Sequence, residues 1–381
     1  MPWKLHEGDC AEVLKQYPDN YFETCITDPP YGMSMKDWDK EAPSIQCWEQ
    51  VYRVLKPGAN ILVFGGTRTH HRLMCALEDV GFDLKDMVMW LYSQGFPKAL
   101  NISKSIAKRV AVQSGGKVDD WRGFYTQLKP AYEPIVLAMK PLEGSYADNA
   151  LEHGVAGLAI DKTRIPSQTP VTINTWDDGA KPFGGGAGSP YTTRQSTRGR
   201  WPANVVFDEG AARQLDQQSG ITKSAATPPT HQQPAYPGNS NTNFLRGVSH
   251  SENQYNDEGG ASRFFYCSKV SVKERTHNGR VENIHPTVKP LALLKYLSEL
   301  TSTPYHSTVL DPFAGTASMG IAALETGRSY VGIELDSDYA LTARKRLIDT
   351  WIRINRNTIR EEKHNTISEA IDTTLKQDSS L

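Results

Sequence analysis

The stretch TDPPYG, residues 27 to 32, places hydrogen-bond acceptors at the end of an apolar, strand-like run, FETCIT. Asp28 offers a carboxylate, and Pro29 and Pro30 offer carbonyl groups but have no backbone N–H to donate. Tyr31 adds an aromatic ring beside them. The stretch therefore predicts a site that is rich in acceptors, poor in donors and bordered by a ring.

A second stretch, VLDPFAGTASMG at residues 309 to 320, has the composition of a strand, a turn and a helix start. Gly315 and its small neighbours allow a ligand to approach the backbone closely. Glu334 ends the next strand-like run, 23 positions after Asp311, where an acid can hold a ribose diol. The dinucleotide pattern GxGxxG is missing from this turn. The stretch predicts a generic nucleotide fold or a site for a cofactor without a pyrophosphate, such as S-adenosylmethionine.

Two segments of the chain alternate strand-like and helix-like runs, which predicts an α/β fold with a mostly parallel sheet. In residues 1 to 140 the strand-like runs are WKLHEGD, ETCITDPP, NILVFGG, DMVMWLY and PIVLAMK, and the helix-like runs are EQVYRVLKPG and HHRLMCALEDVG. The alternation returns from about residue 285. Since both stretches above follow strands of one parallel sheet, we expect them to face the same crevice at its carboxyl edge.

The composition changes between these segments. Residues 149 to 280 are rich in Gly, Ser, Thr, Pro, Asn and Gln and lack long helical periodicity, which indicates a disordered insert or a loop-built recognition domain. Their apolar patches favour the ordered module. The expected division is a catalytic domain in two parts, 1–148 and 281–355, an insert at 149–280 and a polar tail at 356–381.

Composition excludes several classes of protein. With 381 residues, 38% of them hydrophobic, the chain can form a substantial core. Its apolar runs are shorter than the roughly 20 residues of a membrane span, and MPWKLHEGD is not a signal sequence, so we expect a cytoplasmic protein. The five cysteines form no CxxC pair, so we expect reduced thiols and no metal site.

Charge is unevenly distributed although the net charge is only −1. Residues 98 to 130 contain seven basic and two acidic side chains, and residues 162 to 200 contain six and two. Such local excesses suit a surface that follows phosphates, although solvated loop charges explain them equally well. The candidate DNA contacts are Lys98, Lys104, Arg194, Arg198 and Arg200, the three arginines reading guanine edges or binding phosphates.

These motifs together resemble the amino-group DNA methyltransferases, which methylate N6 of adenine or N4 of cytosine. TDPPYG resembles their catalytic motif, LDPFAGTAS their cofactor motif, and HPTVKPLALLKYL at 285 to 297 the segment that precedes the cofactor strand. Gly8 and Asp9 match a Gly-Asp pair that the family places ahead of the catalytic run. The order of catalytic region, recognition insert and cofactor region resembles the beta class, which implies a circularly permuted, Rossmann-like S-adenosylmethionine-dependent sheet with an inserted, loop-rich target-recognition domain.

The resemblance also implies roles for individual residues. Asp28, Pro29, Pro30 and Tyr31 would be catalytic. The residues that would bind S-adenosylmethionine are Asp9, Cys10, Asp28, His285, Thr287, Lys289, Asp311, Pro312, Phe313, Ala314, Gly315, Thr316, Ser318, Glu334 and Leu335. The partner would be double-stranded DNA. A homodimer and a cognate restriction nuclease are compatible with the resemblance, and QGFPKALNISKSI, GRWPANVVFDE and RFFYCSKV further resemble methylases of bacteriophages and prophages.

Adenine is the expected base, because in this family an Asp before the two prolines favours adenine and a Ser favours cytosine. Cytosine-N4 methylation is the nearest alternative. A related class that methylates glutamine in proteins usually has Asn at this position. A non-catalytic nucleic-acid-binding protein with the same fold is the alternative from another class.

Several residues also have plainer structural explanations. Asp9 could simply be a turn-forming residue, and Lys289 could be a surface charge. Trp201 and the aromatic residues 264 to 266 are expected to form the small core of the insert rather than stack on bases. GMSMKDWDKEA, after the catalytic motif, is expected to be a loop that orders over a flipped base.

Overall fold

The computed structural model describes residues 1–33, 41–93, 95, 99–109, 118–167, 171–176, 191–223, 258–268 and 289–356. Lys98, His285, Thr287, most of the loop after the catalytic motif and nearly all of the polar tail lie outside the described residues. Of Arg194 only the backbone is described.

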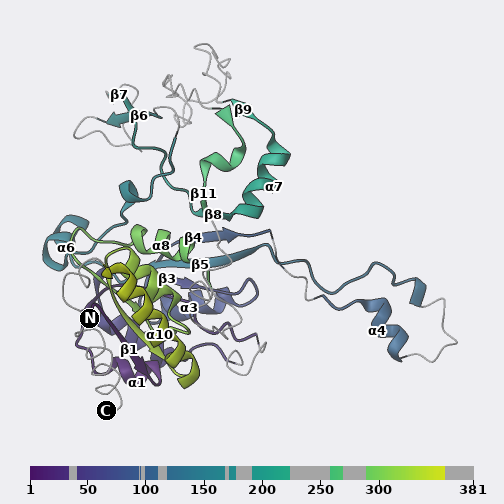
Figure 1. Cartoon of the computed structure of the whole chain (residues 1–381), viewed down its shortest axis with the longest axis horizontal. Helices are drawn as coiled ribbons and strands as arrows, with labels where there is room; N and C mark the ends of the chain where they lie inside the picture. The colour runs from purple at the N-terminus through teal and green to yellow at the C-terminus, as the bar shows by residue number, and fades with distance from the viewer. Residues whose placement is uncertain are drawn as a thin grey trace, which may run out of the picture.

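In the described part of the chain, nine strands form one sheet in the order β1-β13-β12-β2-β3-β5-β4-β8-β11 (Figure 1). All neighbours are parallel except β5, which runs antiparallel to β3 and β4. The expected mixed α/β class with a mostly parallel sheet is confirmed. The strand bounds are β1 Trp3–Glu7, β2 Phe22–Thr27, β3 Leu55–Phe64, β4 Asp83–Leu91, β5 Tyr132–Met139, β8 Val205–Asp208, β11 Tyr266–Ser268, β12 Thr308–Asp311 and β13 Ser329–Glu334.

Helices cover both faces of this sheet and form two separate apolar cores. The helix bounds are α1 Cys10–Leu14, α2 Ile45–Val54, α3 His70–Asp79, α4 Ile102–Arg109, α6 Tyr146–His153, α7 Glu209–Ser219, α8 Leu291–Leu300, α9 Ser318–Glu325 and α10 Ser337–Ile354, with 3-10 turns η2 Ile160–Lys162 and η3 Ala261–Phe264. Residues of α1, α2 and α3 pack on one face, and those of α8, α9 and α10 on the other. Neighbouring side chains of a strand enter opposite cores: Ile61 and Val63 join the first, Leu62 and Phe64 the second.

The N-terminal strand completes the sheet beside the C-terminal strands. β1 pairs in parallel with β13, from Trp3 opposite Tyr330 to Glu7 opposite Glu334. The predicted strand WKLHEGD thus forms the edge of the sheet next to β13. This pairing brings the Gly8–Asp9 pair to the end of β13, where the Gly8 N–H donates to the Glu334 carbonyl at 2.9 Å.

The expected strands are present, but one helix boundary was wrong. The helix predicted to end at Gly58 ends at Val54, and Leu55 is already extended. Pro57 disfavours helical geometry at Lys56, so the helix has to end before that residue. Residues 149 to 280, whose sequence lacks long helical periodicity, contain α7 with 11 residues. Asp208 caps α7 by accepting from the Ala211 N–H at 2.6 Å, a local signal that a polar composition conceals.

Parts of the segment 149–280 belong to the main sheet. β8 pairs in parallel with β4, and β11 with β8. Outside this sheet, β6 (Val171–Trp176) pairs with β7 (Tyr191–Ser196), and β9 (Thr222–Lys223) with β10 (Glu258–Gly259). The expected boundary at residue 148 falls inside α6. Among the described residues no helix has the length and apolarity needed to cross a bilayer.

The side chain of Asn149 joins the start of this segment to the chain beside β3 and β5. It is fully buried, its amide donates to the carbonyls of Pro57 at 2.9 Å and Val155 at 2.6 Å, and its oxygen accepts from the Glu143 N–H at 2.9 Å. All hydrogen-bonding groups of this amide except one lone pair are therefore occupied.

We predict that Asn149→Ala lowers the free energy of unfolding by about 2–3 kcal/mol, because three buried backbone groups lose their partner. Leu151→Ala, on the same helix at a position 88% exposed, should change it by less than about 0.5 kcal/mol. Urea unfolding followed by circular dichroism measures both values. Equal small effects of the two substitutions would contradict the role of Asn149.

Candidate active site

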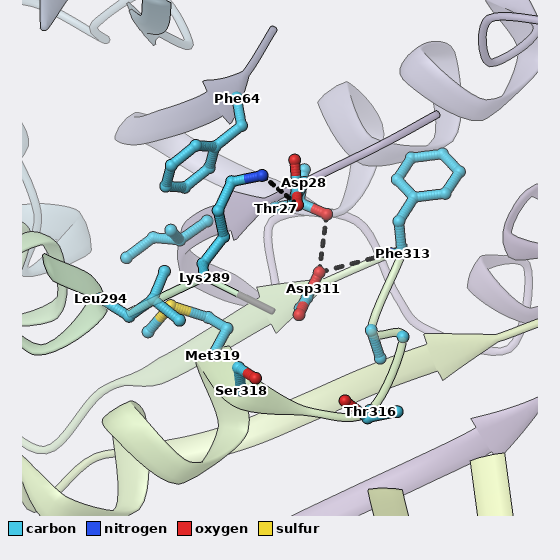
Figure 2. Close-up of a pocket in the computed structure, with 13 residues that line it drawn as sticks. Thr27, Asp28, Phe64, Lys289, Leu294, Asp311, Phe313, Thr316, Ser318 and Met319 are labelled. Atoms are coloured by element: carbon cyan, nitrogen blue, oxygen red, sulfur yellow. Dashed lines mark hydrogen bonds and ion pairs between the residues drawn. The ribbon is translucent and has the colours of Figure 1, made fainter. Parts of the chain in front are cut away.

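The two motifs meet at the point where the order of the sheet reverses. β2 and β12 are paired neighbours; from β2 the chain continues to β3 on one side, and from β12 to β13 on the other. Ligands of such sheets bind in the crevice beyond the strand ends at this point. A cavity lies there, lined by Ile26, Thr27, Asp28, Phe64, Lys289, Leu294, Asp311, Phe313, Ala314, Gly315, Thr316, Ser318 and Met319 (Figure 2).

Asp28, directly after β2, is held on both carboxylate oxygens. The Tyr31 hydroxyl donates to Oδ1 at 2.8 Å, and the Lys289 ammonium donates to Oδ2 at 2.7 Å. Burial, followed by the charges of Asp28 and Glu133, raises the pKa of Tyr31 well above its usual value, so Tyr31 remains a neutral donor. The structure thus brings together three residues that the sequence predicted for the site.

Lys289 is a buried cation, which corrects its interpretation as surface charge. Its side chain is 9% exposed and lies between the carboxylates of Asp28 and Glu133, at 2.7 and 3.2 Å. Burial alone would lower the pKa of the ammonium, but the two carboxylates outweigh burial and raise it. Lys289 is therefore charged over the whole physiological range.

Glu133, on β5, is a residue of this cluster that sequence reasoning missed. It directly precedes the apolar run that predicts the strand, and no motif marks it. It reaches the site because β5 pairs with β3, which itself neighbours β2. Only the sheet order could have identified it.

Asp311 ends β12 and is nearly inaccessible to solvent, with 2% exposed. Its carboxyl accepts from the Thr27 hydroxyl at 2.6 Å, the Tyr330 hydroxyl at 3.2 Å and the Phe313 N–H at 3.3 Å. Burial raises the pKa of Asp311 to about 7 even though these bonds act in the opposite direction. Figure 2 shows Asp311 and Asp28 pointing into the same cavity.

The turn after β12 is shaped for close approach of a ligand. Gly315 has a φ of 52°, and Ala317 a φ of 57°; this left-handed geometry is easy for glycine but costly for alanine. The Gly315 N–H donates to Glu334 Oε2 at 2.6 Å, and the Asp336 N–H to Oε1 at 2.9 Å. Glu334 is thereby fixed at the end of β13, and burial raises its pKa.

Arg346 supports this turn from beneath and was also missed. It is fully buried on α10 and donates to the Thr316 carbonyl at 2.5 Å, the Thr316 hydroxyl at 2.8 Å and the Ser318 hydroxyl at 3.1 Å. Burial lowers its pKa to about 10, which still leaves it charged at neutral pH. The helical pattern of α10 gave no sign of this contact, because a buried arginine is uncommon on a core-facing position.

Asp9 caps α1, accepting from the N–H groups of Ala11 at 2.9 Å and Glu12 at 3.2 Å. These two hydrogen bonds agree with the simpler explanation that Asp9 forms a turn. The neighbouring Gly8 N–H bonds the Glu334 carbonyl, which places Asp9 near Glu334. Cys10 is buried against Cys47. Leu335 is 72% exposed. The predicted cofactor residues that do not line the cavity are Asp9, Cys10, Pro312, Glu334 and Leu335.

The predicted DNA contacts have different surroundings. Lys104 is exposed on α4. Arg198 bonds Asp161 at 2.9 Å, and Arg200 pairs with Ile165 through the backbone and donates to the Arg263 carbonyl at 3.3 Å. Arg200 is therefore part of the framework of the insert.

The aromatic residues expected in the core of the insert separate into three groups. Trp201 is 66% exposed, with the Arg164 guanidinium 5.4 Å from its ring, so its assignment to a core was wrong. Phe265 packs on Phe207 with ring centroids 5.0 Å apart. Tyr266 stacks on Tyr296 of α8 at 4.1 Å and thus packs against the main core.

Comparison with known proteins identifies the family. A family model described as DNA methylase, of the N6/N4 amino-methyltransferase kind, matches residues 22–345. The chain is 30% identical over 359 residues to the type II methyltransferase M.HpaI of Haemophilus parainfluenzae, covering 91% of this chain and 74% of that protein. It is 26% identical over 375 residues to the type II methyltransferase M.HindIII of Haemophilus influenzae, covering 87% and 90%.

The chain therefore belongs to the family of DNA methylases that modify exocyclic amino groups, N6 of adenine or N4 of cytosine. A solved structure, that of the PvuII DNA methyltransferase (cytosine-N4-specific), is similar with a TM-score of 0.45 and 14% identity, covering 92% of both chains. The methyl donor of the family is S-adenosylmethionine, as the motifs predicted.

The cavity fits this donor. Asp311 lines the cavity with a carboxyl group that can accept from cationic or hydroxyl groups. The turn at Gly315, which Glu334 holds from beside the cavity, allows backbone contact. Phe313, Leu294 and Met319 provide apolar walls. In the described part of the chain no group of three His, Cys, Asp or Glu side chains converges in a way that could hold a metal ion.

The raised pKa of Asp311 makes the free energy of unfolding depend on pH. In the folded protein its pKa is about 7, against an ordinary value of 3.8. Between these values the folded state binds the extra proton, so stability is highest at the acidic end and falls as pH rises. We predict that wild type loses about 2 kcal/mol between roughly pH 5 and pH 7 relative to Asp311→Asn, which does not titrate there.

Urea unfolding of both proteins at several pH values measures this difference. Other titrating groups, Glu334 included, are common to the two proteins and cancel. If the free energies of unfolding of the two proteins changed in parallel with pH, the raised pKa of Asp311 would be contradicted.

Proposed function

We propose that this protein transfers the methyl group of S-adenosylmethionine to N6 of adenine in double-stranded DNA. One observation carries the proposal: Asp28 and Gly315, at the ends of neighbouring strands, line the same cavity. An acceptor for an amino group and a cradle for the methyl donor are therefore within reach of each other. Proximity of this kind contributes a large share of the rate of a direct transfer.

The residues around Asp28 match the needs of this reaction. The exocyclic amino nitrogen of adenine is a poor nucleophile, because its lone pair is delocalised into the ring. Asp28 Oδ and the Pro29 carbonyl would accept its two hydrogens and draw the nitrogen toward tetrahedral geometry. The cofactor supplies an electrophilic methyl group. Tyr31 would stack on the base, a contact typically worth about 1–3 kcal/mol.

The target base must leave the double helix to reach this cavity, because its amino group is paired inside the stack. The described residues support such a pocket. The Tyr31 ring lies beside Asp28, with Lys289 5.6 Å from its centroid, and the buried Phe64 ring lies in the wall of the cavity, 5.0 Å from Lys289. We also propose that the chain has the beta-class permutation, because β2, which carries the proposed catalytic motif, precedes β12, which carries the proposed cofactor motif.

Adenine is favoured over cytosine by Asp28 at the first position of the tetrad. The nearest alternative, transfer to N4 of cytosine, uses the same acceptors. The product separates the two: after incubation with DNA, nucleoside mass spectrometry should detect N6-methyladenine without N4-methylcytosine. The reverse result would move the protein to the cytosine branch of the family.

We predict that Asp28→Ala lowers the rate of methyl transfer by at least about a hundredfold, because the acceptor for the reacting amino group is lost. Asp83→Ala, at the exposed first residue of β4, serves as a control and should retain wild-type activity. Transfer of tritiated methyl groups to DNA measures both. Unchanged transfer by Asp28→Ala would rule out the catalytic assignment.

We further propose that the segment connecting β4 and β5 contacts DNA. Figure 1 shows α4 at the outer end of this segment, far from the sheet. Lys104, Lys108 and Arg109 on α4 are exposed. Trp121 and Phe124 on the returning chain are 44% and 55% exposed and contact each other with ring centroids 5.3 Å apart. Exposed cations with nearby rings suit phosphates and unstacked bases.

Replacing Lys104, Lys108 and Arg109 by Gln should weaken DNA binding and reduce the slope of log K against log salt by roughly 2–3, since each phosphate contact contributes about 0.9. Lys4→Gln, on the edge strand β1 at the other end of the sheet, should leave the slope unchanged. Fluorescence anisotropy with a labelled duplex at several salt concentrations measures it. An unchanged slope in the triple variant would remove α4 from the DNA interface.

A further inference from the structure

Each oxygen of the Asp28 carboxylate accepts a hydrogen bond from another residue of the protein. Tyr31 donates to Oδ1 at 2.8 Å and Lys289 to Oδ2 at 2.7 Å. Lys289 also contacts the Tyr31 hydroxyl at 3.2 Å. An amino group arriving at Oδ2 would meet an oxygen that already accepts from a cation, which makes that oxygen a weaker acceptor for a second donor.

Lys289 has a second anionic partner within reach. Glu133 Oε2 lies 3.2 Å from the ammonium and 3.4 Å from the Tyr31 hydroxyl. Asp28 and Glu133 are 28% and 24% exposed, whereas Lys289 is 9% exposed. A cation so buried is costly without a carboxylate beside it, and Glu133 is already within ion-pair distance of Lys289.

The charges of the cluster support the same division of roles. Two carboxylates share one ammonium, so the cluster carries a net charge of −1. During methyl transfer the amino nitrogen of the target becomes positive, and a fixed negative charge beside it stabilises the transition state. If Lys289 were paired with Asp28 alone, it would cancel that charge.

We propose that Glu133 is a positioning residue that holds Lys289 away from Asp28 while the target amino group is bound. The proposal rests on the function proposed above and adds a residue outside the catalytic tetrad. In the free protein Lys289 bridges both carboxylates. When the base binds, its amino group replaces the ammonium at Asp28 Oδ2, and Lys289 keeps Glu133 as its partner.

The surroundings allow this exchange with little movement. The ammonium already contacts Glu133, so only the bond to Asp28 has to lengthen. Pro290 follows as the N-cap of α8 and anchors the backbone of Lys289. Tyr92 also faces the cluster; burial, together with the charge of Glu133, raises its pKa to about 12. Tyr92 is thus uncharged at neutral pH and adds no third anion that could pair with Lys289.

A double-mutant cycle tests the proposal. Glu133→Gln keeps the shape of the side chain and removes its charge, so Lys289 should remain on Asp28. We expect kcat for DNA methylation to fall by at least about tenfold, with the KM for the cofactor within about twofold of wild type. In a Lys289→Met background no ammonium competes for Asp28, and Glu133→Gln should change kcat by less than about twofold.

Binding of DNA gives a readout that a merely structural role would not change. Glu133→Gln should weaken binding to a duplex with adenine at the target position. It should leave binding to the same duplex with an abasic target unchanged, because no amino group then competes with Lys289. The matched controls are Glu143→Gln, at an exposed carboxylate paired with His153, and Lys295→Met, which removes a partly exposed lysine paired with Glu325. Both should behave as wild type.

Glu133→Asp keeps the negative charge and is the control in case Glu133→Gln does not fold. This Asp variant should retain most of the wild-type activity. Two outcomes would overturn the role of Glu133. One is that Glu133→Gln lowers kcat equally with and without Lys289. The other is that Glu133→Asp lowers kcat as much as Glu133→Gln does, while cofactor binding stays normal. A wild-type protein that transfers no methyl group to DNA would instead overturn the proposed function. An active wild type with additive effects contradicts only the positioning role.

Discussion

The hydrogen bond from the Thr27 hydroxyl to Asp311, 2.6 Å long, links two motifs that lie 284 residues apart. It is possible because β2 and β12 pair directly and end at the same edge of the sheet. Thr27 precedes Asp28, and Asp311 begins the turn that reaches Gly315. The position of Asp28 relative to this turn is thus set by one strand pairing and one buried hydrogen bond.

The rest of the site depends on burial around that bond. Asp311 is kept from solvent and holds a raised pKa, while Lys289, equally buried, holds a raised pKa because two carboxylates face it. The two groups illustrate opposite outcomes of the same desolvation: without a cation partner the acid tends toward its neutral form, and with two anionic partners the ammonium stays charged. Acidic and basic groups therefore coexist in one small cavity.

Sequence reasoning predicted the parts of the site that depend on local pattern. Strand-like runs ending in Asp28 and Asp311 belong to neighbouring parallel strands, and the rule that such strands end at one edge places both motifs together. Glu133 and Arg346 could not be found in this way. Glu133 reaches the site only because β5 inserts antiparallel between β3 and β4, and Arg346 because α10 packs under the turn; both depend on tertiary packing that periodicity does not encode. Trp201 was misassigned because an aromatic side chain suggests burial, whereas this ring is 66% exposed with the Arg164 guanidinium beside it.

The same limit explains the segment 149–280, whose composition suggested a separate module. Its strand β8 pairs with β4, whose other neighbour is β5, and these two strands carry the extension with α4. At its base the Ser93 N–H donates to Asp208, at the end of β8, at 3.2 Å, and Lys129 donates to the Ser93 carbonyl at 2.5 Å. The extension and the insert are therefore joined at one place on the sheet. If both contact DNA, the sheet that holds Asp28 also sets the distance from the bound duplex to the cavity.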